Sequence, residues 1–358
     1  MRSTAIVLTL GKLTTNAAKT AHGLIRGSDR FQIVGIIDDA EHAGQDAGTL
    51  LDGKKRGVLV YESLATYLAE GSPTDRAQSC IVGIASAGGK LSPEWFPIFR
   101  QAIQAGMSIV SGMHEFLTDQ PELVALAEQH GVELIDVRKP KAREELHFWT
   151  GSIHEVKAYK LAVLGTDCAV GKRTTARFIV EAARKSGRSA EMIFTGQTGW
   201  MQGSPYGFVF DSTVNDFVSG ELEHAILQCD REAKPDLIVV EGQAALRNPS
   251  GPCGTEFLVS GMMDGVVLVH PPGREYYKGW QHTGRKIPPL ATEIDLIRLY
   301  GVPTVGIAIN DQGLTETEAR KWKAHYEEAL GLPTVLPIQD GVSGLLPAIF
   351  SHLAPKNG

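Results

Sequence analysis

The sequence lacks several features that would assign it to a specialised class of protein. Only four cysteines occur in its 358 residues, and Cys80, Cys168, Cys229 and Cys253 lie far apart. No pair has the C-x-x-C spacing, so the sequence predicts scattered, reduced thiols rather than a disulfide framework or a zinc site. Reduced thiols are typical of the cytoplasm, which is the compartment we expect.

Long apolar runs and an excess of basic charge are also absent. No stretch approaches the ~20 apolar residues that a membrane-spanning helix needs. The formal net charge is -6 at pH 7, so no basic field would attract nucleic acid or an anionic membrane. We therefore expect a soluble globular protein with small-molecule partners, no nucleic acid and no membrane. The sequence leaves a homo-oligomer open.

Short apolar runs, by contrast, recur along the chain and alternate with helix-like segments. This is the pattern of parallel strands that crossover helices bury on both faces, so the sequence predicts the α/β class. A charged stretch without an apolar run, from Arg138 to Lys160, favours a domain boundary. We expect a Rossmann-like parallel sheet over residues 1–150 and a P-loop parallel sheet over residues 151–358. The predicted strands cover residues 4–10, 31–37, 79–85, 107–112, 132–137, 159–165, 190–195, 236–242, 265–270 and 304–310.

Two stretches, "VLTLGKLTTNAAKT" and "VLGTDCAVGKRTTARF", nearly repeat each other. In the first, Gly11 and Lys12 follow the apolar run directly, which leaves no residues to curl around a phosphate. We expect Lys12 to be a solvated residue at the start of a helix. In the second, residues 166–170 separate the strand from Gly171 and Lys172. The order strand, loop, Gly-Lys and helix predicts a phosphate-binding loop in the second stretch.

The second loop has the chemistry that a pyrophosphate needs. Loop amides and the positive end of the following helix hold the phosphates, and Lys172 reaches the terminal ones. A hydroxyl that holds Mg²⁺ normally follows the lysine directly, whereas here Arg173 intervenes. Either the helix start is shifted so that Thr174 still reaches the metal, or the loop binds a pyrophosphate without the usual Mg²⁺ geometry. The residues expected to line the site are Gly165, Thr166, Asp167, Cys168, Ala169, Val170, Gly171, Lys172, Arg173, Thr174 and Thr175.

Other predicted strands end in polar residues that can face the same ligand, because strand carboxyl ends form the ligand crevice of an α/β sheet. Glu241 stands where P-loop proteins place the acidic residue that faces the metal, and it is also a candidate general base. His270 is the second candidate base. Asn310 can read the edge of a nucleotide base. The candidate clamps for substrate carboxylates are Arg247, Arg274 and Arg285.

The stretch "GTDCAVGKRTT" resembles the G-T-D-T-x-V-G-K-T loop of dethiobiotin synthetase and cobyric acid synthase relatives, and "VVEG" resembles their strand-end Glu-Gly. Together with "TGQTGWM", "NDFVSGELE", "VVEGQAAL" and "HPPGR", nearly the whole chain resembles a former domain-of-unknown-function family described as D-glutamate N-acetyltransferase-like. That resemblance implies an acyltransferase working alongside an N-acetyl-D-glutamate racemase in D-glutamate breakdown.

Acetyl transfer to an amine consumes no ATP, so the phosphate loop needs another explanation. Coenzyme A is built on a 3′-phosphorylated ADP, and we hypothesise that the loop anchors the pyrophosphate of acetyl-CoA. Lys172, Glu241 and His270 would then be the catalytic residues, and Arg173 could meet an additional phosphate charge. Two alternatives stay open. One is an ATP-dependent, carboxylate-activating enzyme in which Thr174 and Glu241 hold Mg²⁺, and the other is a nucleotide-sensing regulatory module.

The first domain carries fewer functional signals. Its second predicted strand leads into Asp38 and Asp39, the position at which Rossmann domains grip ribose hydroxyls. The G-x-G-x-x-G fingerprint is absent, so the sequence does not support a dinucleotide site there. We expect a scaffold that forms a crevice or an oligomer contact. In the second domain, we expect Cys253 to be a buried, inert thiol.

Overall fold

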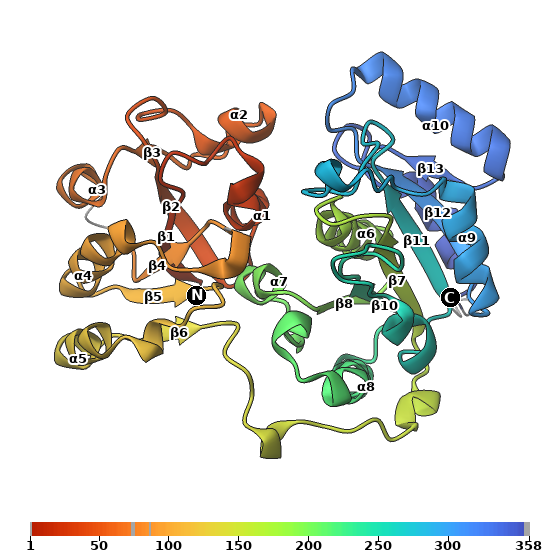
Figure 1. Ribbon diagram of the computed structural model, residues 1–358, viewed down its shortest axis with the longest axis horizontal. Coiled ribbons are helices and arrows are strands. Elements are labelled where there is room, and N and C mark those ends of the chain that lie inside the picture. Colours follow the sequence, from red (N-terminus) through yellow and green to blue (C-terminus); the bar gives the residue numbers. More distant parts are fainter. Residues whose placement is uncertain (1, 73–75, 86, 354–358) are drawn as a thin grey trace. The chain divides into compact units, whose positions relative to one another are not determined.

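The computed structural model describes residues 2–72, 76–85 and 87–353, which form two compact units (Figure 1). The first unit runs to Pro140 and also contains Gln197–Ser204. The second consists of Lys141–Gly196 and the chain from Pro205 onward. This division differs from the expected one at two segments, residues 141–150 and 197–204. The chain therefore passes from one unit to the other three times.

The first unit is built on a six-stranded sheet in the order β3-β2-β1-β4-β5-β6, and all neighbouring strands are parallel. Buried side chains of the strands and helices form its apolar core. The strands are β1 (Ser3–Leu8), β2 (Phe31–Ile37), β3 (Val60–Tyr61), β4 (Ser79–Val82), β5 (Ser108–Ser111) and β6 (Leu134–Asp136). The helices are α1 (Lys19–Arg26), α2 (Ala47–Asp52), α3 (Leu64–Glu70), α4 (Phe96–Gln104), α5 (Pro121–His130) and α7 (Gln197–Gln202).

The second unit is built on a seven-stranded parallel sheet in the order β13-β12-β11-β7-β10-β8-β9. Because β7 lies between β11 and β10, the carboxyl ends of these three strands lie side by side. The strands are β7 (Tyr159–Gly165), β8 (Ala190–Phe194), β9 (Tyr206–Gly207), β10 (Leu237–Glu241), β11 (Gly265–His270), β12 (Thr304–Ile309) and β13 (Thr334–Val335). The helices are α6 (Lys172–Lys185), α8 (Asn215–Ala233), α9 (Leu290–Leu299), α10 (Glu316–Leu330) and α11 (Leu346–Phe350).

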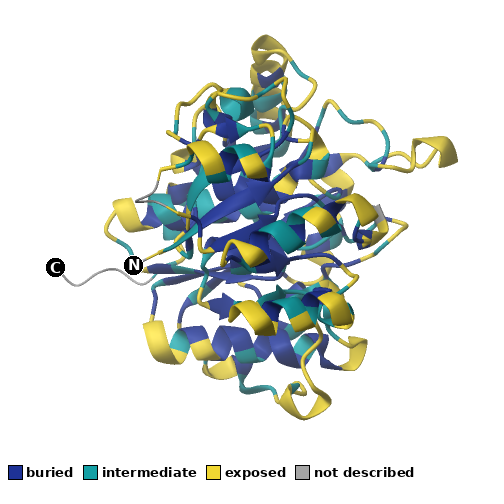
Figure 2. Ribbon diagram, turned by 90° about the vertical axis from the view of Figure 1, so that its left-hand side faces the viewer, coloured by how far each residue is buried: buried dark blue, intermediate teal, exposed yellow. Residues whose placement is uncertain are grey.

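The α/β class and both parallel sheets are confirmed, and every predicted apolar run contains a strand. Figure 2 shows the strands as the buried layer, with exposed residues on the outer faces of the helices. The strands β3, β9 and β13 give no signal in the sequence, because each has two residues and lies at a sheet edge. Among the described residues, no helix is both long and apolar enough to span a membrane.

The short helix α7 belongs to the first unit although it follows a strand of the second. Its Gln202 side chain donates hydrogen bonds to the carbonyls of Gly23 (2.7 Å) and Gly27 (3.0 Å) at the end of α1. The guanidinium carbon of Arg30 lies 4.1 Å from the ring centre of Trp200, a favourable cation–π contact. Residues 197–201 of the "TGQTGWM" stretch therefore pack as part of the first unit.

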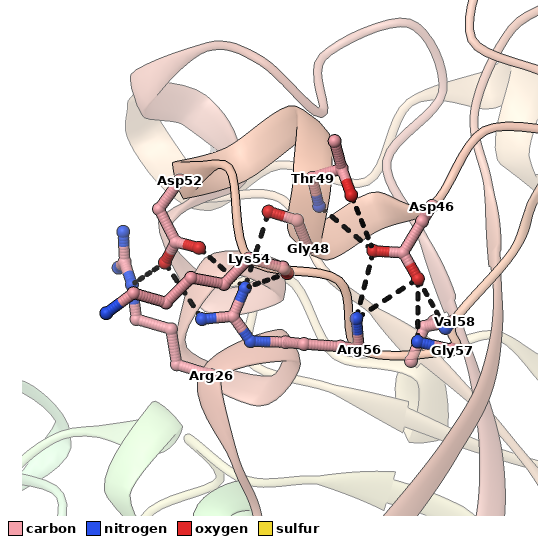
Figure 3. Close-up of polar contacts among 9 residues, drawn as sticks. All are labelled: Arg26, Asp46, Gly48, Thr49, Asp52, Lys54, Arg56, Gly57 and Val58. Atoms are coloured by element: carbon pink, nitrogen blue, oxygen red, sulfur yellow. Dashed lines mark hydrogen bonds and ion pairs between the residues drawn. The ribbon is translucent and has the colours of Figure 1, made fainter.

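In the first unit, Asp46 fixes the loop that leads into β3 (Figure 3). One of its carboxylate oxygens caps α2 by accepting from the backbone N–H of Thr49 at 2.9 Å. The carboxylate also accepts from the backbone N–H groups of Arg56, Gly57 and Val58. Burial opposes ionisation of Asp46, but these backbone hydrogen bonds outweigh it and lower its pKa to about 2.

In the second unit, two buried glutamates of α8 hold the chain that leads into β7. Glu221 is 2% exposed and lies 2.6 Å from Lys141 Nζ and 2.8 Å from His147 Nδ1. Glu223 accepts from the backbone N–H and the hydroxyl of Thr150. The "NDFVSGELE" stretch therefore anchors residues 141–153 on α8 through buried carboxylates that are fully hydrogen-bonded.

Candidate functional site

The predicted phosphate loop joins β7 to α6. Gly171 is the N-cap of α6, with φ of +97°, and Ala169 within the loop has φ of +51°. Left-handed residues inside a short loop create the concave arrangement of N–H groups that binds anions. Gly165 allows this path, because a Cβ atom there would lie 2.7 Å from Val170 Cγ2. The backbone therefore has the form of a phosphate cradle at the amino end of a helix.

Lys172 ties the loop to the segment that follows β10. Its side chain is buried, and Nζ donates to the carbonyl of Asp167 at 2.9 Å and to that of Ala244 at 2.7 Å. Burial lowers its pKa, an effect that the nearby acidic groups of the site, including Glu241, oppose. Ala244, like Ala169, has a positive φ, which is uncommon for a residue with a side chain. Backbone strain of this kind gathers at binding sites.

The helix register bears on the metal question. Helix α6 begins at Lys172, with Gly171 as its N-cap, so the start of the helix is not shifted towards Thr174. Arg173 occupies the position of the hydroxyl that holds Mg²⁺ in P-loop proteins. Successive helical residues are rotated by about 100°, so Thr174 points in a different direction. Thr175 is buried within the first turn of the helix. The assignment of Thr174 and Glu241 as metal ligands stays a prediction.

Asp167 connects the phosphate loop to the loops that follow β10 and β11. Its side chain is completely buried. One carboxylate oxygen accepts from the Cys168 backbone N–H (2.6 Å) and from Asn248 Nδ2 (2.9 Å). The other accepts from Arg274 Nη1 (2.8 Å) and from the Lys278 backbone N–H (2.9 Å). Asn248 and Lys278 were not among the predicted site residues, although the basic residues of "GREYYKGW" were a signal for Lys278.

The two candidate bases differ in environment. His270 is buried at the end of β11, and its Nδ1 lies 2.8 Å from the hydroxyl of Thr166. Burial and the nearby charge of Arg274 lower its pKa to about 4, so His270 is neutral at pH 7. Glu241 is buried at the end of β10, and its Oε2 lies 3.4 Å from the backbone N–H of Thr195. Both residues lie at strand ends next to β7, where the sequence pattern placed them.

The remaining predicted residues lie in different surroundings. Arg247 Nε lies 2.5 Å from the buried carboxylate of Glu293 on α9, so its guanidinium already has an anionic partner. Asn310 donates to the Val170 carbonyl at 3.0 Å and so supports the end of the phosphate loop. Arg285 is exposed in the segment before α9. The carboxylate-clamp and base-reading roles of these residues stay predictions.

The other Gly-Lys pair does not form a cradle, as predicted. The backbone N–H groups of Lys12 and Leu13 donate to Asp38 Oδ1 at 3.1 and 3.2 Å. Asp38 is buried, and its other oxygen lies 3.0 Å from His42 Nδ1. Lys12 is exposed, but the expected helix start is wrong, because the first helical turn begins at Asn16. The loop after β1 therefore uses these two amides to bind an aspartate of its own chain.

All four cysteines are free thiols, as the sequence predicted. Burial raises the pKa values of Cys80, Cys229 and Cys253 to about 12. Thiols of this kind stay protonated at neutral pH and are poor nucleophiles. Cys253 is therefore the inert, buried residue expected from the sequence.

Comparisons with known proteins match both halves of the chain. A family model described as the P-loop domain of a domain of unknown function, DUF1611_C, matches residues 147–346. The model of its Rossmann-like domain, DUF1611_N, matches residues 40–140. The predicted division into a Rossmann-like and a P-loop fold is thereby confirmed.

Two curated relatives carry the name D-glutamate N-acetyltransferase. The protein from Pseudoalteromonas sp. is 32% identical over 277 residues, which cover 75% of this chain and 80% of the relative. The protein from Tritonibacter scottomollicae is 31% identical over 278 residues, which cover 76% and 81%. A crystal structure of a DUF1611 family protein from Anabaena variabilis is 30% identical, with a TM-score of 0.87 over 97% of this chain and 99% of that one.

Proposed function

This chain belongs to the DUF1611 family, and two of its curated relatives are named D-glutamate N-acetyltransferase. We propose that the chain transfers an acetyl group from acetyl-CoA to the amino group of D-glutamate or a similar acidic amino acid. The observation that carries this proposal is the phosphate loop from Asp167 to Lys172, followed by Arg173 in place of the metal-binding hydroxyl.

The loop suits the pyrophosphate of coenzyme A. The left-handed backbone of Ala169 and Gly171, the amino end of α6 and the Lys172 ammonium are all anion-binding features. Acetyl transfer leaves the pyrophosphate intact, so no metal is needed to stabilise a departing phosphate. Arg173 adds a permanent positive charge at the first turn of α6. This charge favours coenzyme A over ADP, because coenzyme A carries a 3′-phosphate in addition to its pyrophosphate.

The chemical step needs a base, because an ammonium group has no lone pair with which to attack a thioester. We assign this role to Glu241 rather than to His270. Burial and the nearby positive charge of Arg274 oppose protonation of His270, and its Nδ1 is already bonded to Thr166. The acidic side chain of Glu241, by contrast, can attract the ammonium group. Glu241 accepts the ammonium proton, the amine forms the new C–N bond and the thioester C–S bond breaks. The thiolate of coenzyme A leaves and takes up the second proton that the nitrogen loses as the amide forms.

One observation favours a second candidate function. Glu241 ends β10 beside the phosphate loop, in the place of the metal-facing acid of ATP-dependent P-loop enzymes. In an ATP-dependent, carboxylate-activating enzyme, Glu241 and Thr174 would hold Mg²⁺ and the loop would hold ATP. Such an enzyme must release ADP or phosphate, whereas an acetyltransferase must release a free thiol. The two functions therefore differ in their products.

The test is an assay of the purified chain for thiol release from acetyl-CoA with D-glutamate, L-glutamate or D-alanine as acceptor. We expect release with D-glutamate that persists in EDTA and is lost in Lys172→Ala. Lys185→Ala, an exposed lysine in the last turn of the same helix, is the matched control. Strictly Mg²⁺-dependent release of ADP or phosphate would establish the ATP-dependent function instead. Ligand binding without any turnover would favour a regulatory module.

A further inference from the structure

We propose that Arg274 and Lys278, on the loop that follows β11, bind the carboxylate groups of the acyl acceptor beside the phosphate loop. This inference rests on the acetyltransferase function proposed above and adds the site that recognises an amino dicarboxylic acid. Lys278, which was not among the predicted site residues, thereby gains a role.

A shared partner fixes both residues at the start of the phosphate loop. Asp167 Oδ2 accepts from Arg274 Nη1 at 2.8 Å and from the Lys278 backbone N–H at 2.9 Å. Arg274 Nη1 also lies 2.9 Å from the Cys168 carbonyl. A single buried carboxylate thus determines where the Arg274 guanidinium and the Lys278 backbone lie relative to the loop.

Positively charged side chains outnumber the single carboxylate of Asp167 at this place. Arg274 Nη1 pairs with the Asp167 carboxylate. The Lys172 and Lys278 ammonium groups are close enough for the charge of Asp167 to oppose the lowering of their pKa values by burial. Both oxygens of Asp167 already accept two hydrogen bonds each. Burial and the charge of Arg274 lower the pKa of Lys278, because neither favours a further positive charge there. A bound carboxylate would supply the missing negative charge, and ion pairs of this kind are strongest in partly buried sites.

Donors remain available for such a ligand. The Arg274 side chain is 17% exposed, and only its Nη1 bonds to another residue within the described chain. Nε and Nη2 are thus left to donate. Lys278 bonds to Asp167 through its backbone, so its ammonium group is not needed to hold the loop. Arg247 is a weaker candidate for this role, because its Nε and Nη2 already donate to Glu293 and Thr292, which leaves it fewer donors than Arg274.

The order of the strands places this cationic pair suitably for catalysis. Arg274 and Lys278 follow β11, the phosphate loop follows β7, and Glu241 ends β10, and these strands are neighbours in the order β11-β7-β10. The proposed clamp and the proposed base therefore lie on opposite sides of the loop. An acceptor held by its carboxylates on the β11 side can direct its amino group towards the thioester and Glu241.

The test compares Lys278→Met with Lys286→Met in steady-state kinetics. Lys286 is a mostly exposed lysine a few residues further along, paired with Glu275, and serves as the matched control. In Lys278→Met we expect the KM for D-glutamate to rise about ten- to a hundredfold, as for a lost charge-assisted hydrogen bond. The KM for acetyl-CoA should not change. Lys278→Arg should restore much of the affinity, and the preference for D-glutamate over D-glutamine should fall in Lys278→Met.

A calorimetric titration with D-glutamate alone separates this inference from the proposed function. If the wild type acetylates D-glutamate and Lys278→Met does so with an unchanged KM, the clamp is wrong and the acetyltransferase function stands. If no acceptor is acetylated, the function fails. D-glutamate binding that is equal in the wild type and in Lys278→Met would overturn the site whatever the turnover.

Discussion

Replacing Asp167 with asparagine should destabilise the second unit and weaken ligand binding at the phosphate loop. The substitution keeps the shape of the side chain but removes its charge and converts one oxygen into an NH₂ group. If this group takes the position of Oδ2, it faces the donors of Arg274 and Lys278. In the flipped orientation it faces the donors of Cys168 and Asn248. Either way, two hydrogen bonds are lost and donors oppose each other.

The magnitude follows from burial and charge. A hydrogen bond to a charged group contributes about 1.5–3 kcal/mol, and removing one partner of a buried ion pair costs about 3–5 kcal/mol. Because the Arg274 side chain is 17% exposed, water can compensate for part of the loss, and we expect a decrease of about 3 kcal/mol in the free energy of unfolding. For a unit of about 200 residues, this corresponds to a Tm lower by roughly 6–12 °C.

The assay is differential scanning calorimetry of the wild type, Asp167→Asn and Asp295→Asn. Asp295 undergoes the same chemical change, but its ion pair with Arg298 lies on the surface of α9 with both side chains more than half exposed. Such a pair contributes about 0–1 kcal/mol, so this variant should unfold close to the wild type. Equal Tm values for the two variants would refute the central role of Asp167.

Three further predictions concern the loop, the strand end and the anchored segment. Lys172→Ala should abolish coenzyme A binding in a calorimetric titration, whereas Lys12→Ala, in the other Gly-Lys pair, should leave it nearly unchanged; similar losses would contradict the asymmetry of the two loops. Between pH 7 and pH 5 the wild type should lose about 2 kcal/mol more stability than His270→Asn, because an unfolded histidine with a pKa of 6.5 takes up a proton there while buried His270, with a pKa of about 4, does not. Parallel pH profiles in urea unfolding would count against this assignment. Gly220→Ala should lower the Tm although alanine is the better helix former by about 1 kcal/mol, since the added Cβ atom would collide with the carbonyl of His147; a higher Tm would show that the segment on α8 can move away.

Local patterns in the sequence were sufficient to predict the two parallel sheets and the phosphate loop. A buried parallel strand needs a continuous apolar run, and this signal is contained within the strand itself. The cradle of "GTDCAVGKRTT" was equally readable, since the number of residues between a strand and Gly-Lys decides whether the backbone can curl. The same count excluded Gly11 and Lys12 as a phosphate cradle, and in the structure the N–H groups at this position have a partner within the chain. Asp38 accepts the N–H groups of Lys12 and Leu13.

Only the tertiary structure decided which partner each charged side chain has. Nothing in the sequence near Asp167 indicates that it binds Arg274 and the backbone of Lys278, more than 100 residues away. The pairing of Arg247 with Glu293 was hidden for the same reason, as was the packing of α7 in the first unit. Secondary structure follows from interactions between residues close in the chain, whereas the partner of a side chain depends on which strand ends the sheet order brings together.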